Sequence, residues 1–380
     1  MKKIALLGFG VVGKGVYDQI AKRDDLEVAR VLVRRTIDVV AAISTTDIND
    51  IVSDPAIDTV VEVMGGVHPA YEYIAAALNA GKNVVTANKA VISACYRQLT
   101  ALAAEKGVAL RCTAAVGGGI PWLINLERCL RLDTVTEVSG IMNGTTNYIM
   151  DAMHKSPVAF ADILKKAQEL GYAEADPSAD IDGDDIRRKL TISANIAFGA
   201  LLDEEIIPMF GIRTVTDGDI ATFQSEGYVC KLIATARKTE GGVAAWLEPT
   251  LVDSHALEAA VPANYNLISF QSEYLGRQSY FGQGAGRYPT ASNVVQDCLD
   301  ILNGKTAFYA EKAVPMLPDN SGVCHGYYVR CAAKDAWLDS VTVKAMGGGV
   351  VTAEVSVADM LAWAKAKLAE DPALFIAAIG

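Results

Sequence analysis

Short apolar runs alternate with stretches of helical periodicity over the first 130 residues. The run Ile4–Leu7 ends in glycines, Val11–Lys22 places apolar residues at helical spacing, and Val28–Val33 is apolar again. The alternation continues with expected strands at Thr59–Val63, Asn83–Thr86 and Ala109–Thr113 and expected helices at Ala70–Ala80 and Ala90–Lys106. Strands that alternate with helices are typical of a doubly wound parallel sheet. The pattern therefore predicts an α/β fold with a Rossmann-type domain at residues 1–130.

The pattern changes after Pro121. A strand is expected at Thr134–Ile141, and helices are expected at Ala159–Leu170 and Asp184–Leu201. From Val243 to Phe281 apolar and polar residues alternate between turn signals, as in an antiparallel sheet. These elements predict a second, α+β domain at residues 131–284.

A third segment, residues 321–380, follows a helix expected at Thr290–Leu302 and a linker rich in proline, asparagine and glycine. It is expected to contain three strands and a final helix, at Gly326–Ala333, Ser340–Met346, Val350–Val355 and Ala358–Leu368. Only Lys334–Asp339 remain between the first two strands, which predicts that no helix forms there.

Composition and charge limit the partners. The 380 residues are 51% hydrophobic with a net charge of −11, which argues against nucleic acid or an anionic membrane as the main partner. No apolar stretch is long enough to span a membrane. The seven cysteines form no C-x-x-C pair, which indicates reduced thiols in a cytoplasmic protein.

A G-x-G-x-x-G motif directly follows the first expected strand and opens the first expected helix. It consists of Gly8, Phe9, Gly10, Val11, Val12 and Gly13. In this context the glycines allow a tight turn, close approach of a pyrophosphate and helix–strand packing, so the motif predicts dinucleotide binding.

Arg34 and Arg35 end the second expected strand, where an NAD site would carry a carboxylate. A guanidinium there suits a 2′-phosphate and favours NADP. The alternative is two solvated surface arginines.

Six carboxylates lie within Gly171–Asp185, without the spacing of an EF-hand calcium loop. They could form a solvated acidic turn. Asp185 and Lys189, however, stand at i and i+4 on the helix that follows, beside an apolar stripe, so they are a candidate acid/base pair. An ordinary surface ion pair is the alternative. Lys89 follows a parallel strand at its carboxyl end, where doubly wound sheets bind ligands.

These motifs, taken in order, resemble homoserine dehydrogenase over about residues 4–305. The resemblance rests on the stretches Gly8–Gly13, Glu62–Gly66, Thr86–Lys89, Gly118–Pro121, Asn143–Ile149, Gly171–Lys189 and Gly284–Ser292. It implies an enzyme that interconverts L-homoserine and L-aspartate 4-semialdehyde with NADP or NAD. It also implies that residues 131–284 form the catalytic and dimerisation domain of a homodimer or homotetramer.

The resemblance also implies roles for single residues. Lys189 and Lys89 match the lysines at the reacting oxygen, and Asp185 pairs with Lys189. The substrate amine and a water would be held by Glu174, Asp180 and Asp185, beside a substrate site lined by Tyr172, Asn143, Gly144 and Thr145. Besides the glycine motif and the two arginines, the cofactor site would include Gly65, Asn88, Lys89, Gly284 and Gly286, with residues 285–320 completing the first domain.

The chain departs from the family pattern in two places. Family members commonly carry a glutamate at the position of Thr113, which holds a sodium-type ion together with backbone carbonyls near Val116, Gly118 and Ile120. Thr113 lacks that charge, so the resemblance leaves the monovalent cation open.

The second departure is at the end of the chain, where many bacterial members have a regulatory ACT domain. Residues 321–380 match a truncated ACT-like segment without its first helix. The missing helix would leave Tyr327, Tyr328, Val329 and Trp337 partly bare, so we expect this tail to pack against another subunit or against its own core. We expect weak or absent threonine inhibition, with the tail acting in assembly.

Two other functions compete with this one. Aspartate-semialdehyde dehydrogenase shares the Rossmann start, but its reaction needs a cysteine nucleophile with a histidine base, and no cysteine here has such surroundings. A cofactor-sensing binding protein could keep the fold without catalysis. Such a protein would be free to lose Lys89, Glu174, Asp185 and Lys189, which are all present.

Overall fold

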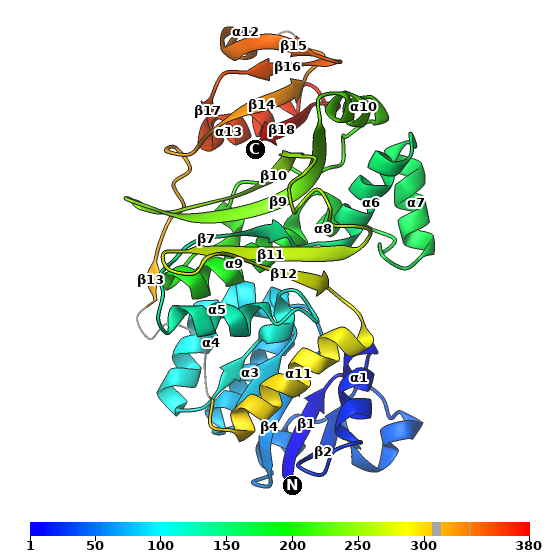
Figure 1. The fold of residues 1–380 in the computed structure, drawn as a ribbon. Coiled ribbons are helices and arrows are strands. Elements are labelled where there is room, and N and C mark those ends of the chain that lie inside the picture. The colour runs from blue at the N-terminus through cyan, green and yellow to red at the C-terminus, as the bar shows by residue number, and fades with distance from the viewer. Residues whose placement is uncertain (306–312, 334) are drawn as a thin grey trace. The chain divides into compact units, whose positions relative to one another are not determined.

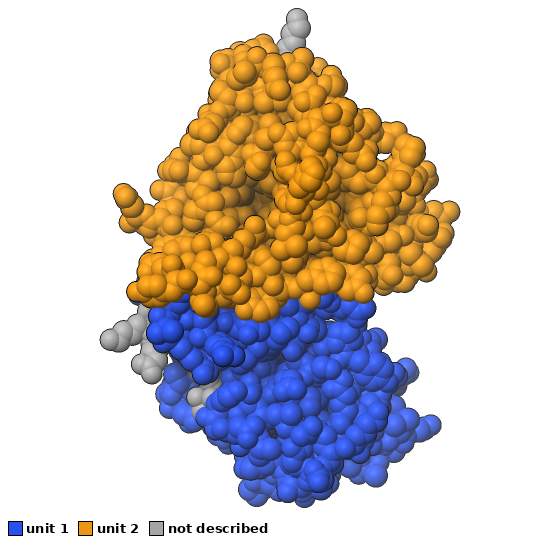
Figure 2. Space-filling view, in the orientation of Figure 1, with its two compact units in different colours: residues 1–133, 191–201, 282–315 blue, residues 134–190, 202–281, 316–380 orange. Residues whose placement is uncertain are grey.

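The computed structural model describes residues 1–305, 313–333 and 335–380, and the chain divides into two compact units (Figures 1 and 2). Unit 1 comprises Met1–Asp133, Thr191–Leu201 and Gly282–Pro315. Unit 2 comprises Thr134–Leu190, Leu202–Phe281 and Met316–Gly380.

Unit 1 contains a six-stranded parallel sheet in the order β3-β2-β1-β4-β5-β6. Its strands are β1 (Lys2–Leu7), β2 (Leu26–Leu32), β3 (Ser44–Thr45), β4 (Ile57–Glu62), β5 (Asn83–Thr86) and β6 (Leu110–Arg111). This is the strand order of a doubly wound dinucleotide-binding sheet, with its switch point between β1 and β4. The Rossmann-type prediction is confirmed.

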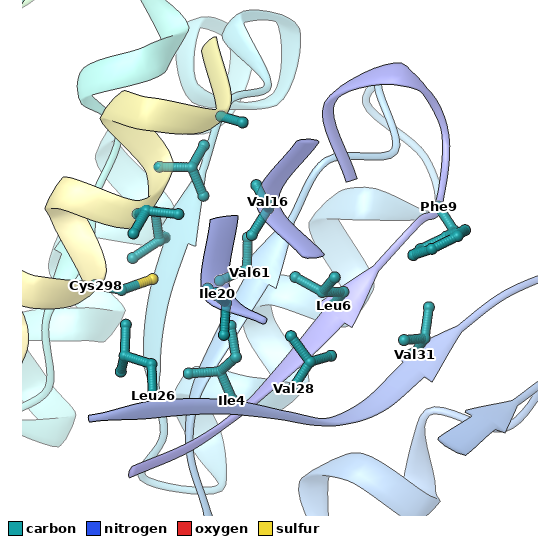
Figure 3. Close-up of a cluster of buried hydrophobic side chains, with 14 of the residues drawn as sticks. Ile4, Leu6, Phe9, Val16, Ile20, Leu26, Val28, Val31, Val61 and Cys298 are labelled. Carbon is teal, nitrogen blue, oxygen red and sulfur yellow. The ribbon is translucent and has the colours of Figure 1, made fainter. Parts of the chain in front are cut away.

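The helices α1 (Val11–Ile20), α3 (Ala70–Asn79), α4 (Lys89–Lys106) and α11 (Arg287–Leu302) pack against this sheet (Figure 1). Unit 1 also contains α2 (Asn49–Val52) and α5 (Trp122–Leu130). α11 comes from far downstream and packs against α1, where a Cβ on Gly15 would lie only 2.7 Å from the Arg287 carbonyl oxygen. The shared core contains Ile4, Leu6 and Val16 together with Cys298 of α11 (Figure 3).

Unit 2 is built on a mixed sheet in the order β12-β11-β7-β9-β10-β18-β14-β16-β15, with β17 paired to β14. The strands are β7 (Val135–Ile141), β9 (Tyr228–Thr239), β10 (Gly242–Asp253), β11 (Tyr265–Ser272), β12 (Gly276–Gln283), β14 (Cys324–Arg330), β15 (Thr342–Met346), β16 (Gly349–Thr352), β17 (Val355–Ser356) and β18 (Phe375–Ile379). The helices are α6 (Gly144–Lys155), α7 (Phe160–Glu169), α8 (Ser178–Ile181), α10 (Asp217–Ser225), α12 (Ala336–Val341) and α13 (Val357–Lys367), and α9 (Asp184–Phe198) begins here.

The tail, residues 321–380, continues this sheet. β18 pairs in parallel with β10 and antiparallel with β14. Tyr327, Tyr328 and Val329 are therefore buried. The tail packs against the core of its own chain, which is one of the two expected outcomes, and the expectation of a partly bare sheet face is wrong. The expectation of no helix before the second strand is also wrong, because Asp335 caps α12 by accepting a hydrogen bond from the Leu338 N–H at 2.9 Å. Lys334 lies outside the described residues.

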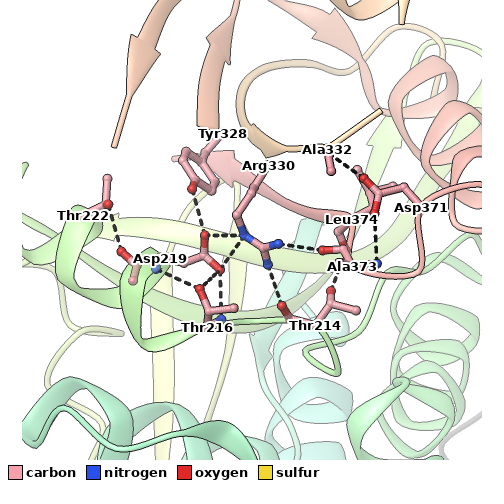
Figure 4. A network of polar contacts seen from close by, with 11 residues as sticks. Thr214, Thr216, Asp219, Thr222, Tyr328, Arg330, Ala332, Asp371, Ala373 and Leu374 are labelled. Carbon is pink, nitrogen blue, oxygen red and sulfur yellow. Dashed lines mark hydrogen bonds and ion pairs between the residues drawn. The ribbon is translucent and has the colours of Figure 1, made fainter. Parts of the chain in front are cut away.

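Buried polar groups join the tail to α10 (Figure 4). The Asp219 carboxylate accepts hydrogen bonds from the Tyr328 hydroxyl and the Arg330 Nε, both at 2.8 Å. The Arg330 guanidinium also donates to the carbonyls of Thr214 and Ala373. Arg330 therefore ties β14 to the start of α10.

Across the described part of the chain, no helix combines the length and apolar character needed to cross a membrane.

Candidate active site

The three glycines of the motif have different surroundings in unit 1. Gly8 has a φ of +100°, which disfavours other residues, and a Cβ on Gly13 would lie 2.5 Å from the Gly8 carbonyl oxygen. A Cβ on Gly10 would meet no atom within 4 Å. Gly8 and Gly13 therefore shape the turn, whereas Gly10 leaves the backbone open at the start of α1. This is the arrangement that lets a pyrophosphate approach helix N–H groups.

Other predicted cofactor residues stand at the same edge of the sheet. Arg34 and Arg35 are exposed just after β2, and Gly65 follows β4. Within the glycine motif, Val11 is 67% exposed, whereas Phe9 is buried against the Tyr17 ring at 5.6 Å. Because the strands are parallel, their carboxyl ends share one edge, where doubly wound folds bind ligands.

Glu62 organises this edge, and the sequence interpretation gave it no role. Its side chain is fully buried at the end of β4 and accepts hydrogen bonds from the Met64 N–H at 2.7 Å and the Thr86 hydroxyl at 2.6 Å. Asn88 donates to the Gly66 carbonyl at 2.6 Å. Burial raises the pKa of Glu62, against the effect of these hydrogen bonds. The loops after β4 and β5 are thereby fixed to one another.

Lys89 begins α4 beside this loop pair. The preceding Asn88 caps the helix, with its side-chain oxygen accepting from the Val91 N–H at 3.3 Å. Lys89 is half-buried, so a charged amine stands at the carboxyl end of the sheet, as predicted from its position after β5.

In unit 2, Lys189 and Asp185 form a buried ion pair on α9. The Lys189 Nζ donates to Asp185 Oδ2 at 2.7 Å and to the Met142 carbonyl at 2.6 Å. Only 8% of each side chain is exposed, so the alternative of a surface ion pair does not hold. A buried pair of this kind is stable only with further hydrogen bonds.

Asn143 supplies those further bonds. Its Nδ2 donates to Asp180 Oδ1 at 2.7 Å and to Asp185 Oδ2 at 2.8 Å, while its Oδ1 caps α6 by accepting from the Thr146 N–H at 2.8 Å. Burial, and then the charge of Asp185, raise the pKa of Asp180. The Asn143 amide thus links the Asp180 and Asp185 carboxylates, and Asp185 also pairs with Lys189.

The other residues predicted for the substrate site differ in their contacts and burial. Thr145 donates its hydroxyl to the Tyr172 carbonyl at 2.6 Å, and the Tyr172 ring lies 5.1 Å from that of Tyr148. Gly144 leaves no room for a side chain, because a Cβ would lie 2.7 Å from the Asn264 carbonyl oxygen. Glu174 is exposed on the turn after α7, outside the hydrogen-bonded cluster of Lys189, Asp185, Asn143 and Asp180.

The predicted ion ligands lie in unit 1 after the short helix η2 (Thr113–Ala115). Val116 and Ile120 are buried, and the Thr113 hydroxyl donates to Asp297 Oδ1 at 2.7 Å. Within the described ranges, no three His, Cys, Asp or Glu side chains gather in a way that could hold a metal ion.

A Rossmann-type unit with an open glycine turn is typical of a dinucleotide-dependent oxidoreductase. Comparison with known families gives the particular class. Residues 8–113 match the family model described as "Homoserine dehydrogenase, NAD binding domain", and residues 121–299 match the model "Homoserine dehydrogenase". The chain belongs to the homoserine dehydrogenase family.

Individual relatives agree. Homoserine dehydrogenase from Bacillus subtilis is 37% identical over 314 residues, which cover 79% of this chain and 72% of the relative. The enzyme from Pseudomonas aeruginosa is 38% identical over 357 residues, covering 88% and 82%. The crystal structure of a homoserine dehydrogenase from Thiobacillus denitrificans aligns with a TM-score of 0.84 at 32% identity, covering 100% of this chain and 98% of that one.

The chain is therefore an oxidoreductase that interconverts L-homoserine and L-aspartate 4-semialdehyde with NAD or NADP. The matches favour neither aspartate-semialdehyde dehydrogenase nor a cofactor-sensing protein without catalysis.

Proposed function

We propose that Lys189, with Asp185 and Lys89, carries the proton chemistry of this reaction. The observation that supports the proposal is the buried Lys189–Asp185 pair, held by Asn143 and the Met142 carbonyl. An ammonium in such a position is fixed before substrate arrives, so little reorganisation is needed when charge develops on a reacting oxygen.

The nicotinamide ring, when bound, gives or accepts the hydride. During reduction the aldehyde oxygen of L-aspartate 4-semialdehyde gains negative charge as its carbon receives the hydride. Lys189 stabilises that charge and passes a proton to the oxygen, which yields the hydroxyl of L-homoserine. In the reverse direction the neutral amine of Lys189 takes the hydroxyl proton. Asp185 keeps the amine oriented, and Lys89 is assigned to the same oxygen.

The substrate amine is assigned to Asp180, Asp185 and Glu174, because an ammonium needs carboxylates around it. Asp180 lies in the cluster with Asn143, and the exposed Glu174 would have to reach it on binding. Gly144, Thr145 and Tyr172 are proposed to line the substrate site beside this cluster.

Changing Lys189 to alanine tests this assignment. We expect kcat to fall by about 100-fold or more, the scale of general acid/base catalysis, while the dissociation constant for NADPH stays near the wild-type value. Lys165→Ala, which removes an exposed lysine from α7, is the matched control. Near-wild-type turnover in Lys189→Ala would assign the chemistry elsewhere.

For the cofactor, we propose that Gly8–Gly13 receives the pyrophosphate and that Arg34 and Arg35 meet the 2′-phosphate of NADP. Gly65, Asn88, Gly284 and Gly286 complete the proposed cofactor site. The exposed arginines after β2, with no carboxylate in their place, support a preference for NADP.

Arg34→Ala tests this preference. The ratio of kcat/KM for NADP to that for NAD should fall, and the wild-type ratio itself should shrink at high salt, because an exposed contact between arginine and phosphate is screened. Arg97→Ala removes an exposed arginine from α4 and should leave the ratio unchanged. The cofactor assignment fails if Arg34→Ala keeps the wild-type ratio.

We also propose that the enzyme works in the cytoplasm as a homodimer or homotetramer. Large apolar side chains support assembly, since Tyr274, Leu275 and Phe281 at β12 and the turn before it are 80%, 56% and 55% exposed. Light scattering of the purified chain measures its mass, and a monomer at assay concentration would contradict the proposal.

A further inference from the structure

The turn at residues 117–120 of unit 1 contains two of the carbonyls that the family resemblance assigns to a monovalent cation. Gly118 has a φ of +52°, and a Cβ there would lie 2.5 Å from the Gly284 carbonyl oxygen. The Gly119 N–H donates to the Gln283 carbonyl at 3.1 Å. The turn is thus packed directly against the segment that contains Gly284 and Gly286.

An amide nitrogen of α11 already satisfies both carbonyls. Asn293 Nδ2 donates to the Gly118 carbonyl at 2.6 Å and to the Ile120 carbonyl at 2.9 Å, and both bonds are buried. Two acceptors at hydrogen-bond distance identify the atom as the nitrogen of the amide, since an oxygen would be repelled by both. A cation could use the lone pairs that face Asn293 only by displacing the Asn293 nitrogen.

The charge at this turn also does not suit a cation. Thr113 is neutral, and the carboxylate of Asp297, one turn along α11 from Asn293, is already engaged. It accepts from the Thr113 N–H at 2.8 Å, from the Thr113 hydroxyl at 2.7 Å and from the Arg111 Nε at 3.1 Å. Arg111 is fully buried and brings a permanent positive charge to the same stretch of chain. The residues present therefore do not fit a monovalent cation.

We propose that the side-chain amide of Asn293 takes the structural place of the cation, so that this enzyme neither binds nor requires a monovalent cation at the 117–120 turn. One face of α11 then fixes residues 113–120, which follow β6. Asp297 binds the start of this segment at Thr113, and Asn293 binds its end at Gly118 and Ile120. Asn293 is a positioning residue, because it acts on the Gly284–Gly286 segment through the turn.

The first test uses the wild-type chain in buffer free of sodium and potassium. Thermal unfolding and homoserine oxidation are measured with added NaCl, KCl or tetramethylammonium chloride at equal ionic strength. We expect the three salts to give the same Tm and rates that agree within twofold. A Tm or a rate raised specifically by sodium or potassium would overturn the proposal. The unfolding measurement does not depend on activity, so it remains decisive even if the proposed residue roles fail.

The second test is the isosteric substitution Asn293→Asp, which puts a carboxylate oxygen against two carbonyl oxygens. We expect Tm to fall by about 5 °C or more. Asn125→Asp is the matched control, because Asn125 Nδ2 donates to the Pro121 carbonyl in an exposed bond whose loss should change Tm little. If Asn293→Asp unfolds at the wild-type temperature, the amide does not hold the turn. If Asn293→Asp does not fold, the wild-type salt comparison still decides the question.

Discussion

Lys231 is another buried lysine of unit 2, and no motif or spacing in the sequence distinguishes it. It lies on β9 with 1% of its surface exposed, and its Nζ donates to Asn147 Oδ1 at 2.9 Å and to the Val261 carbonyl at 2.8 Å. Asn147 in turn donates to the Ala263 carbonyl at 2.8 Å. The adjoining Asn264 approaches Gly144, so Lys231 supports the loop beside the proposed substrate site.

The pH dependence of stability tests the state of Lys231. Burial lowers the pKa of this amine from 10.5 to about 8. Between pH 8 and 10 the unfolded chain therefore binds more protons at Lys231 than the folded chain does, so folding stability contributed by this group rises with pH.

We expect the free energy of unfolding of the wild type, minus that of Lys231→Met, to increase by about 2 kcal/mol from pH 8 to pH 10. Taking the difference removes the contributions of other titrating groups. Chemical denaturation of both proteins across this range supplies the measurement. A difference that stays constant or decreases with pH would show that the pKa of Lys231 is not lowered.

At the scale of residues, the spacing along the chain predicts some contacts of the proposed site and not others. Lys189 and Asp185 are four residues apart on one helix, so their pairing was predictable from the sequence alone. Asn143 joins Asp180 and Asp185 across about forty residues of chain, and Asn293 meets Gly118 across 175 positions. An asparagine carries no periodic signal, and these contacts exist only once the strands are paired.

At the scale of elements, five of the six parallel strands of unit 1 were predictable because they form short apolar runs. The two-residue strand β3 (Ser44–Thr45) is polar and was missed. The long strand β9 was not predicted, since Lys231 interrupts its apolar residues. α6 was missed as well. It starts with Gly144, Thr145 and Thr146, which are poor helix formers, and its start depends on the cap made by Asn143.

The turn between β1 and α1 allows a matched pair of substitutions. Gly10→Ala adds a methyl where the structure has no neighbouring atom, so Tm should stay near wild type. The same methyl would stand in the path of the pyrophosphate, so the affinity for NADPH should fall by about tenfold or more. Gly13→Ala should lower both Tm and affinity, because its Cβ would collide with the Gly8 carbonyl oxygen.

Cofactor fluorescence titration and thermal unfolding separate the two effects. Wild-type affinity in Gly10→Ala would contradict the proposed path of the pyrophosphate, even if Gly13→Ala behaves as expected.

At the scale of the whole molecule, the tail is part of the core of unit 2. Its last strand was missed, because Phe375–Ile379 is a short apolar run whose partners, β10 and β14, are not its neighbours in sequence. The expectation that one sheet face is partly exposed was wrong for the same reason, because the sequence interpretation included neither β18 nor the capped helix α12.

Deletion of residues 323–380 should therefore remove more than an assembly surface. It takes away β18 from beside β10 and leaves Asp219 of α10 without Arg330 and Tyr328. We expect the shortened chain to be insoluble or to melt well below the wild type. A deletion variant with wild-type Tm and a smaller oligomer would instead assign the tail to assembly alone.

Weak or absent threonine inhibition was expected from the missing helix, and α12 removes that reason, so the full chain has to be assayed directly. Homoserine oxidation is measured over increasing L-threonine. If the expectation holds, rates remain close to the uninhibited value, and strong inhibition would contradict it.

Absorbance at 340 nm, measured with the purified chain, L-homoserine and either NADP or NAD at alkaline pH, tests the assigned reaction most directly. Reduced cofactor should accumulate only when L-homoserine is present, and Lys189→Ala should abolish most of the signal. No reduction of either cofactor by the wild-type enzyme, under conditions in which it remains folded, would contradict the assignment of this chain as a working homoserine dehydrogenase.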